Sequence, residues 1–384
     1  MIKLFVIAVF CLLLSVTPVK IENPDIIKIG IFSRYNIDEF NFSALEGSYY
    51  VIDNNNGEII KDIKQFENVL VKQTDNQIKI VLNNDTITTN EGITFSGQSF
   101  KNTFLINPIN GNIGFRIYDD DLSANPGFQG MTVINSVPFE NYIAGVVQSE
   151  SGFGRHPEYY NLQATISRTY AIKNLNRHIH EDFHLCDEVH CQAYYGKSLY
   201  PAIIFATEYT RGDVIIDKNN QPINTVFHAN CGGTTVNSEH VWINASTYLK
   251  SVKDTFCIDM PGSKWEKTIS EELLRQYLQH NLGVKFNDSI ANSIFNLTQT
   301  QRKFFLDPYE KIHLGRFRTD FDLRSTYFDM IPQGDSILLK GRGYGHGVGL
   351  CQEGAMRMAE KGISRDSIIR FYYKDAKLET SDNY

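Results

Sequence analysis

Short apolar runs separated by polar turns dominate the first third of the chain. Runs such as IIKIGIF from Ile26 and IKIVL from Ile78 are rich in β-branched residues, and turn residues such as Asn56-Gly57 lie between them. Runs of this length bounded by turn residues are typical of strands. The pattern therefore predicts a β-rich region over about residues 20–110, either an accessory domain or the β-rich lobe of a larger fold.

From about residue 139, the apolar residues recur at the spacing of a helix instead of in short strand-like runs. A short helix is predicted over Phe139–Ser149, where Pro138 suits the start because its missing N–H costs nothing there. A longer helix is predicted over Glu158–Arg177. Its apolar residues recur at helical spacing at Leu162, Ile166 and Tyr170.

The last third mixes both patterns. SEELLRQYLQHNLG predicts a helix that Ser270 caps and Gly283 stops, and RSTYFDMIPQGDSILLKGRGYG predicts two strands joined by a turn. Two short helices close the chain, one over Gln352–Lys361 and one after Ser364. Together these elements predict an α+β fold, with a mixed α/β core over 111–384 behind the β-rich region.

Glycine occupies every second position of GRGYGHGVGL, which begins at Gly341. The segment lacks the motifs of a phosphate-binding loop. Strict alternation predicts an extended strand with one face of bare backbone. A bare face allows close approach, either by a neighbouring segment of the chain or by a ligand.

The N-terminus resembles a secretory signal. Lys3 precedes an apolar run from Leu4 to about Val16, which is shorter than the ~20 residues that a membrane-spanning helix needs. We therefore expect residues 1–19 to be a signal peptide, the protein to be exported to the periplasm or cell envelope, and the mature protein to have no stable membrane span.

Composition narrows the possible partners. Hydrophobic residues make up 42% and charged residues 21% of the chain, as in ordinary globular proteins, and the formal net charge is -7. No basic cluster stands out, although nucleic-acid binding requires a Lys/Arg face. Nucleic acid is therefore not an expected partner.

The segment RHIHEDFHLCDEVHCQAY concentrates His and Cys. Two thiolates and two imidazoles can complete a tetrahedral zinc site. The preferred ligands are His180, Cys186, His190 and Cys191, with His184 as the substitute. Four protein ligands would make the site structural or positioning, whereas three would leave a position open for catalysis. The alternative is a disulfide between the two cysteines.

Three more cysteines follow, which makes the number outside the signal segment odd. Cys231 and Cys257 could form a disulfide, leaving Cys351 unpaired. A pair of Cys351 with His346 then gives a hypothesis of cysteine nucleophile catalysis.

Glu150 closes the apolar stretch of the first helix, where the helix gives way to the loop SGFG. A carboxyl group beside apolar residues in a cleft has a raised pKa and can act as a general acid. An exposed, solvated carboxylate is the alternative for such a position.

Five segments, in this order, resemble the sequence blocks of the SpoIID/LytB family, named for stage II sporulation protein D and the amidase enhancer. They are VINSVPFENYIAGVVQSE, QATISRTYA, FHANCGGTTVNSEHVW, FRTDFDLRSTYFD and GRGYGHGVGLCQEGAMRMAEKG. The resemblance covers roughly residues 111–378.

The resemblance implies a lytic transglycosylase, as in the family's sporulation members, which cut peptidoglycan glycan strands and prefer strands without stem peptides. The matched positions imply Glu150 as the catalytic acid and Arg168 as the residue that assists it. Some members bind zinc through two His and two Cys after the second helix, which corresponds here to the cluster at 180–191. Candidate substrate-binding residues in the matched segments are His228, Tyr344, His346 and Gln352.

The implied reaction needs only one carboxyl group. Glu150 protonates the glycosidic oxygen and then removes the proton of the muramic 6-hydroxyl, which closes a 1,6-anhydro ring without adding water. The two carboxylates of hydrolases are then unnecessary, and Arg168 is expected to hold a sugar carboxyl or hydroxyl group. LytB-type members instead stimulate an amidase, so the resemblance also allows a non-catalytic, peptidoglycan-binding activator of a cell-wall amidase.

Overall fold

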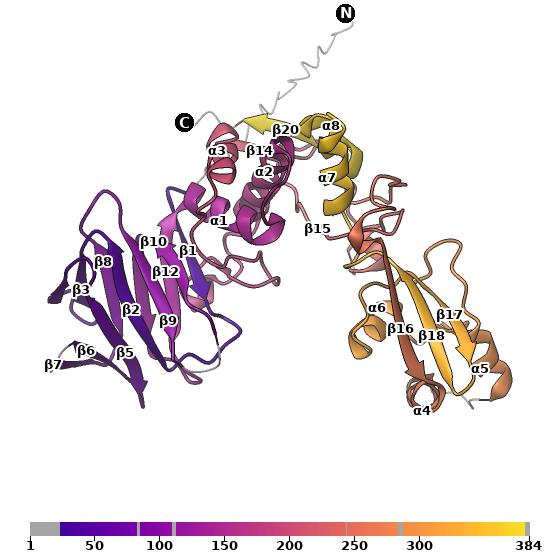
Figure 1. Ribbon diagram of the computed structural model, residues 1–384, viewed down its shortest axis with the longest axis horizontal. Coiled ribbons are helices and arrows are strands. Elements are labelled where there is room, and N and C mark those ends of the chain that lie inside the picture. The colour runs from indigo at the N-terminus through magenta and orange to yellow at the C-terminus, as the bar shows by residue number, and fades with distance from the viewer. Residues whose placement is uncertain (1–23, 83–84, 110–112, 243, 283–286, 381–384) are drawn as a thin grey trace, which may run out of the picture.

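The computed structural model describes residues 24–82, 85–109, 113–242, 244–282 and 287–380. The expected signal peptide at 1–19 and the expected helix stop at Gly283 lie outside these residues. Eight α-helices and twenty strands form within them, so the predicted α+β class is confirmed. The chain forms an arch in which two large sheets stand at one end, helices cross the top, and a smaller sheet with three helices stands at the other end (Figure 1).

The first end of the arch contains two facing sheets. The seven-stranded sheet runs in the order β13 (Leu185–Cys186), β1 (Ile26–Ile31), β12 (Thr132–Pro138), β11 (Asp121–Asn125), β8 (Ile93–Gly97), β3 (Tyr49–Asp53) and β4 (Ile59–Ile63). The six-stranded sheet runs in the order β10 (Arg116–Asp119), β9 (Thr103–Pro108), β2 (Glu39–Glu46), β5 (Asn68–Thr74), β6 (Gln77–Leu82) and β7 (Asp85–Thr89).

Alternating side chains explain why these sheets face each other. Phe40 and Phe42 of β2 are buried between partly exposed neighbours. The ring of Phe42 stacks on Phe95 of β8 in the other sheet, with 3.9 Å between centroids. Strand β1 pairs antiparallel with β12, with Ile27 opposite Val137. Strands from both sides of residue 110 therefore belong to one sheet.

Helices α1 (Phe139–Ser151), α2 (Pro157–Lys173) and α3 (Pro201–Tyr209) follow this sheet. Helix α1 forms where the sequence predicts it. Helix α2 ends four residues earlier than expected, because the N–H of Asn174 bonds to the carbonyls of Tyr170 and Ala171 and the chain turns away. This turn leads directly into the His- and Cys-rich segment.

A second core lies under the top of the arch. It contains the pairs β14 (Asp213–Ile216) with β20 (Lys377–Thr380) and β15 (Phe227–His228) with β19 (Leu350–Cys351), and helices α7 (Gln352–Glu360) and α8 (Arg365–Tyr372). Helix α8 is capped by Ser364, whose hydroxyl accepts the N–H of Ser367. Both terminal helices are thus confirmed.

The far end of the arch is a three-stranded sheet in the order β16 (Lys264–Ser270), β18 (Ser336–Arg342) and β17 (Phe328–Gln333). Helices α4 (Glu271–Leu282), α5 (Asp288–Phe295) and α6 (Leu314–Asp320) accompany it in a third core. The hydroxyl of Ser270 accepts the N–H of Leu273, which confirms the expected cap.

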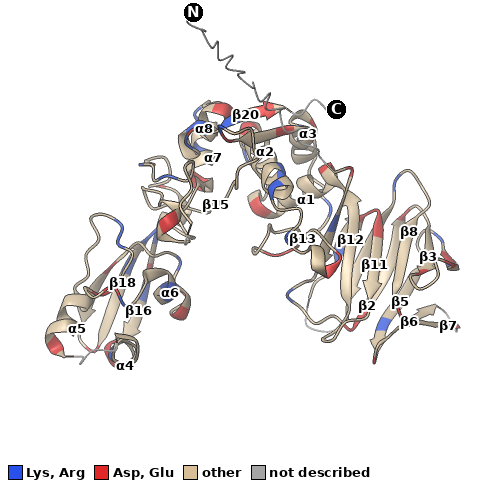
Figure 2. Ribbon diagram, turned by 180° about the vertical axis from the view of Figure 1, so that it is seen from behind, with Lys and Arg blue, Asp and Glu red and all other residues tan. Residues whose placement is uncertain are grey.

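Charged residues of both signs are interspersed over every part of the described ribbon (Figure 2). Among the described residues, no helix combines the length and the apolar character that crossing a membrane requires.

Candidate active site

A pocket of about 770 Å³ lies where α1, the His- and Cys-rich segment, β15 and the glycine segment meet. It brings together most of the residues that the sequence singles out, namely Glu150, His190, Cys191, His228, Tyr344, His346 and Gln352. They come from segments up to about 200 positions apart, and only the folded chain gathers them.

Glu150 lies in the last turn of α1 and is partly buried at the edge of the pocket. Its Oε1 accepts the backbone N–H of Ala193 at 2.9 Å. Burial raises the pKa of Glu150, and the hydrogen bond from Ala193 opposes this effect in part. The raised pKa agrees with the expectation for a general acid.

The glycine segment differs from the predicted strand. Strand β18 ends at Arg342, and Gly343, Gly345, Gly347 and Gly349 all have positive φ, between 69° and 111°. The extended conformation was therefore a wrong prediction beyond residue 342. These positive φ angles explain the glycines, because residues with a Cβ rarely adopt them.

Close approach, by contrast, is confirmed. A Cβ on Gly349 would lie 2.2 Å from the carbonyl oxygen of Val226, and one on Gly343 would lie 2.6 Å from that of Asn230. The glycine segment thus packs against residues 226–236, and Tyr344, Gly345 and His346 still line the pocket.

Two histidines of the pocket wall are held by backbone groups. The Nδ1 atom of His346 accepts the N–H of Val348 at 3.1 Å, and its Nε2 donates to the carbonyl of Phe227 at 2.9 Å. Burial lowers the pKa of His346 to about 4, so the ring is neutral at neutral pH. Because both nitrogens are occupied, His346 can offer a sugar only its ring.

His228 has a different hydrogen-bonding state. Its Nδ1 faces the carbonyl of Val348 at 3.0 Å and therefore carries the proton. Its Nε2, a lone-pair acceptor, is buried without a partner in the described chain. The Nε2 donor of Gln352, another pocket residue, is also buried without a hydrogen-bond partner in the described chain. The pocket thus contains one unpaired acceptor and one unpaired donor.

Aromatic side chains also line the pocket. Tyr344 is 47% exposed and Trp242 is 41% exposed, and the Trp242 ring lies 5.2 Å from that of His346. Trp242 and the pocket cations Arg177 and Arg318 were not among the residues predicted from the sequence. The end of the matched segment FHANCGGTTVNSEHVW was the available signal for Trp242, whereas no local pattern marks the two arginines.

Arg168 does not have the expected position. It is fully buried, and its guanidinium makes a bidentate ion pair with Glu140 of α1, at 2.9 and 2.6 Å. Its remaining N–H groups donate to the carbonyls of Thr207 and Asp213. Arg168 therefore ties α1, α2, α3 and β14 together and does not line the pocket. It cannot hold a sugar group in this structure.

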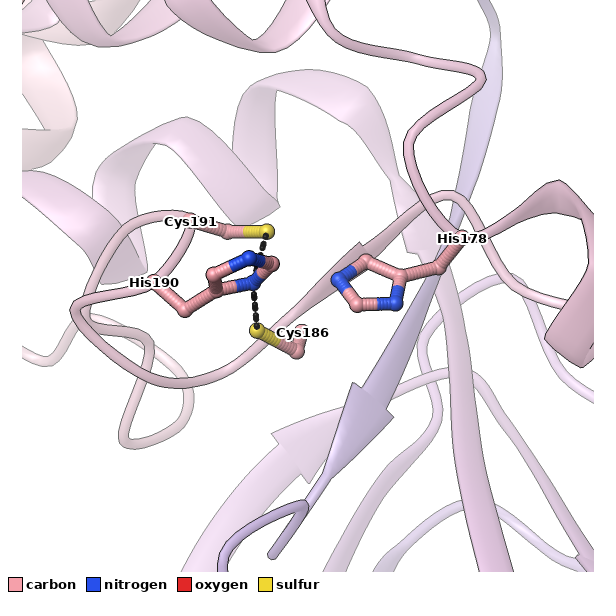
Figure 3. Close-up of side chains that lie close together, drawn as sticks. All are labelled: His178, Cys186, His190 and Cys191. Atoms are coloured by element: carbon pink, nitrogen blue, oxygen red, sulfur yellow. Dashed lines mark hydrogen bonds between the residues drawn. The ribbon is translucent and has the colours of Figure 1, made fainter. Parts of the chain in front are cut away.

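The metal-ligand cluster also differs from the predicted set. One ligand atom each from His178, Cys186, His190 and Cys191 lies within 4.8 Å of the others. Figure 3 shows these four side chains close together. His180 lies in an exposed 3-10 turn outside this group. The substitute His184 accepts the N–H of Lys28 instead. His180 was the preferred ligand from the sequence, but the turn after α2 brings His178 to the thiols instead.

These residues fit zinc. The Nδ1 atom of His178 donates to Glu181 at 2.6 Å, which leaves its buried Nε2 as a lone pair with no partner in the described chain. A carboxylate that orients an imidazole is the usual outer partner of a zinc-bound histidine. The hydrogen bond from Cys191 lowers the pKa of Cys186 to about 4, which favours its thiolate. Zinc would be held by two thiolates and two imidazoles.

The other cysteines contradict two expectations. The five cysteines that the structure describes are all free, and the Sγ atoms of Cys231 and Cys257 lie 3.4 Å apart without a bond. Cys351 is fully buried, outside the described lining of the pocket, and burial raises the pKa of its thiol. It is therefore not placed to act as a nucleophile toward a ligand in this pocket.

Known proteins that are similar to this chain belong to the SpoIID type. The family model of the SpoIID stage II sporulation protein matches residues 128–216, which include Glu150 and the zinc-type cluster. Stage II sporulation protein D of Bacillus subtilis (strain 168) is 31% identical over 269 residues, 65% of this chain and 77% of that protein. The corresponding protein of Bacillus amyloliquefaciens is 28% identical over the same shares.

A further relative is the amidase enhancer of Bacillus subtilis (strain 168). It is 25% identical over 288 residues, which cover 62% of this chain and 40% of that protein. Given the identity and coverage to stage II sporulation protein D, the chain belongs to the SpoIID/LytB family.

Proposed function

We propose that this protein acts on the cell wall as a lytic transglycosylase that cleaves the glycan strands of peptidoglycan, with strands lacking stem peptides as the preferred substrate. The observation that carries the proposal is Glu150, a partly buried carboxyl group with a raised pKa at the edge of the 770 Å³ pocket. Membership in the SpoIID/LytB family supports the cell-wall role.

In the proposed reaction, protonated Glu150 gives its proton to the glycosidic oxygen as the bond to the muramic C1 breaks. The resulting carboxylate then accepts the proton of the 6-hydroxyl, whose oxygen bonds to C1 and closes the 1,6-anhydro ring. Glu150 ends protonated and no water is consumed. A raised pKa suits this role because the cycle begins with the neutral acid.

The rest of the pocket suits a glycan. The exposed rings of Tyr344 and Trp242 offer apolar faces on which sugar rings can stack. The unpaired donor of Gln352 and the unpaired acceptor of His228 can exchange hydrogen bonds with hydroxyl or acetamido groups. A ligand that pairs these atoms removes the cost of leaving them buried and unsatisfied.

The zinc-type cluster is proposed to position Glu150. Cys191 is two residues before Ala193, whose N–H holds the carboxylate oxygen of Glu150. Zinc bound there would supply a rigid, four-coordinate crosslink of the loop. The chain's own Ala193 N–H then fixes the acid relative to the sugar.

Export to the cell envelope is part of the proposal, since peptidoglycan lies outside the cytoplasmic membrane.

The amidase enhancer among the relatives favours a second candidate function, a non-catalytic activator of a cell-wall amidase that binds peptidoglycan through the same pocket.

The test is incubation of the purified protein with glycan strands stripped of stem peptides, followed by separation of the products. Cleavage by the wild type and its loss in Glu150→Ala support the transglycosylase. If Glu150→Ala cleaves as well as the wild type, the assignment of Glu150 is wrong. If neither protein cleaves but the wild type raises the rate of a purified amidase, the activator function is supported instead.

A further inference from the structure

Three cysteines outside the pocket converge on one point of the second core. Cys231, Cys257 and Cys351 come from separate segments, and each is fully buried. The Sγ atom of Cys231 lies 3.4 Å from Sγ of Cys257 and 3.4 Å from Oδ2 of the buried Asp254. One ligand atom from each of these four residues lies within 4.8 Å of every other.

These separations suit a tetrahedral ion. Zn–S bonds of about 2.3 Å place two sulfurs of one zinc site about 3.8 Å apart. A disulfide between Cys231 and Cys257 would use two of the groups, but it would leave a third thiol and a carboxyl group buried at the same point without a purpose. A metal ion uses all four.

Two backbone N–H groups point at the sulfur of Cys351, although burial raises the pKa of the free thiol. The N–H of Cys231 donates to the Sγ of Cys351 at 3.2 Å. The N–H of Gly354, in the first turn of α7, donates to the same Sγ at 3.4 Å. The positive end of α7 therefore faces this sulfur. Donors of this kind stabilise the anionic sulfur that metal binding requires.

The carboxylate of Asp254 is held in a fixed orientation. The hydroxyl of Tyr372 donates to Oδ2 at 2.8 Å, and the N–H of Phe256 donates to Oδ1 at 2.9 Å. Outer hydrogen bonds of this kind orient the ligands of metal sites. Oδ2 also accepts the thiol of Cys231 at 3.4 Å, and a metal ion would take the place of that proton.

Arg302 supplies positive charge beside the cluster. Its guanidinium donates to the carbonyls of Cys231 and Thr234. Three thiolates and one carboxylate around a divalent ion would leave excess negative charge, which Arg302 offsets in part.

We propose that Cys231, Asp254, Cys257 and Cys351 form a second, closed zinc site, separate from the cluster of His178 and independent of the proposed reaction. With four protein ligands and no open position, the site is structural. It would join the segment 231–257, which follows β15, to Cys351 at the start of α7. The site would thereby stabilise the pocket wall that carries His228 and Gln352.

The test is the zinc content of the purified full chain, prepared without chelators, by elemental mass spectrometry. We expect about two zinc ions per chain in the wild type, about one in Cys186→Ser/His190→Ala, and about one in Cys351→Ser. Because Cys351→Ser changes a buried residue and could unfold the chain, the decisive variant is Cys186→Ser/His190→Ala, which leaves the second core intact.

Retention of one zinc ion by Cys186→Ser/His190→Ala supports the proposal, and complete loss of zinc in this variant overturns it. Intact mass spectrometry of the alkylated wild type supplies a second measurement. Three alkylated thiols at the buried site are expected after the metal is removed under denaturing, non-reducing conditions. A Cys231–Cys257 disulfide in place of two of them would also overturn the proposal, and neither result depends on cleavage activity.

Discussion

At the residue scale, the proposed function rests on the environment of one carboxyl group. Burial raises the pKa of Glu150, while a single backbone N–H, that of Ala193, stabilises its charged form. The absence of a cation in direct contact, among the interactions that the structure describes, leaves burial as the dominant effect on its pKa.

We therefore predict that the cleavage rate at saturating glycan falls as the pH rises through the raised pKa of Glu150. The sign follows from the mechanism, because the neutral acid starts the reaction and its fraction decreases above the pKa. The measurement is kcat between about pH 4 and pH 9. A kcat that increases steadily with pH over this range would contradict a general-acid role.

Arg168 gives a prediction of stability at the same scale. Arg168→Ala leaves the carboxylate of Glu140 buried and without its partner, which costs about 3–5 kcal/mol of unfolding free energy. The measurement is urea unfolding, with Glu140→Gln/Arg168→Met as the matched control, because removing both charges restores part of the loss. Wild-type stability in Arg168→Ala combined with loss of cleavage would instead favour the catalytic role that the family resemblance implies.

At the scale of elements, local patterns predicted several helices and strands but not α5 or α6. Apolar spacing, a helix-starting proline and Ser caps predicted α1, α4, α7 and α8, because these signals act within one or two turns of the chain. The same reasoning failed in the glycine segment, where contacts with residues 226–236 select positive φ over an extended strand. It also chose His180 over His178, because the turn that directs an imidazole is set by packing and not by spacing.

The cluster of His178, Cys186, His190 and Cys191 gives a prediction that distinguishes His178 from His180 as a zinc ligand. His178→Ala should weaken zinc binding at this cluster by at least about 10-fold, and the same order is expected for Glu181→Ala, which removes the outer partner of His178. His180→Ala is the matched control and should bind zinc like the wild type. Competition with a chromophoric chelator measures the affinities, and a loss in His180→Ala equal to that in His178→Ala would refute the assignment.

The glycine segment gives a prediction about close packing. Gly349→Ala places a Cβ against the carbonyl of Val226, at a position with φ of 69°. Gly334→Ala is the matched control, because its φ is 59° but no atom lies within 4 Å of the added Cβ. Backbone strain alone costs about 1–3 kcal/mol, so urea unfolding should show a larger loss for Gly349→Ala. Equal losses would mean that close approach is unimportant there.

At the scale of the whole molecule, the arch brings distant segments into one pocket. The sequence marked Glu150, His228, Tyr344, His346 and Gln352 as candidates through family motifs, and the fold places all of them around the same cavity. The sequence could not show that Arg168 is buried in an ion pair or that Arg177 and Arg318 reach the pocket. Such facts depend on contacts between segments far apart in the chain.

The boundary between the β-rich N-terminal region and the core also belongs to the scale of the whole molecule. The resemblance begins near residue 111, yet β1 pairs with β12 across that point and the first core includes residues from both sides. We propose that the region before residue 110 is a scaffold or a binding module attached to a core over 111–384, and that the shared sheet holds it in a fixed position.

The most direct test of the proposed function is the mass of the products from defined glycan strands without stem peptides. The wild type should release fragments that end in 1,6-anhydromuramic acid, lighter by one water than hydrolysis products. Glu150→Gln, which keeps an acceptor for the N–H of Ala193, should remain folded and reduce the rate by about 10²–10⁴-fold. Fragments with reducing muramic ends, or unchanged cleavage by Glu150→Gln, would contradict the single-carboxyl transglycosylase.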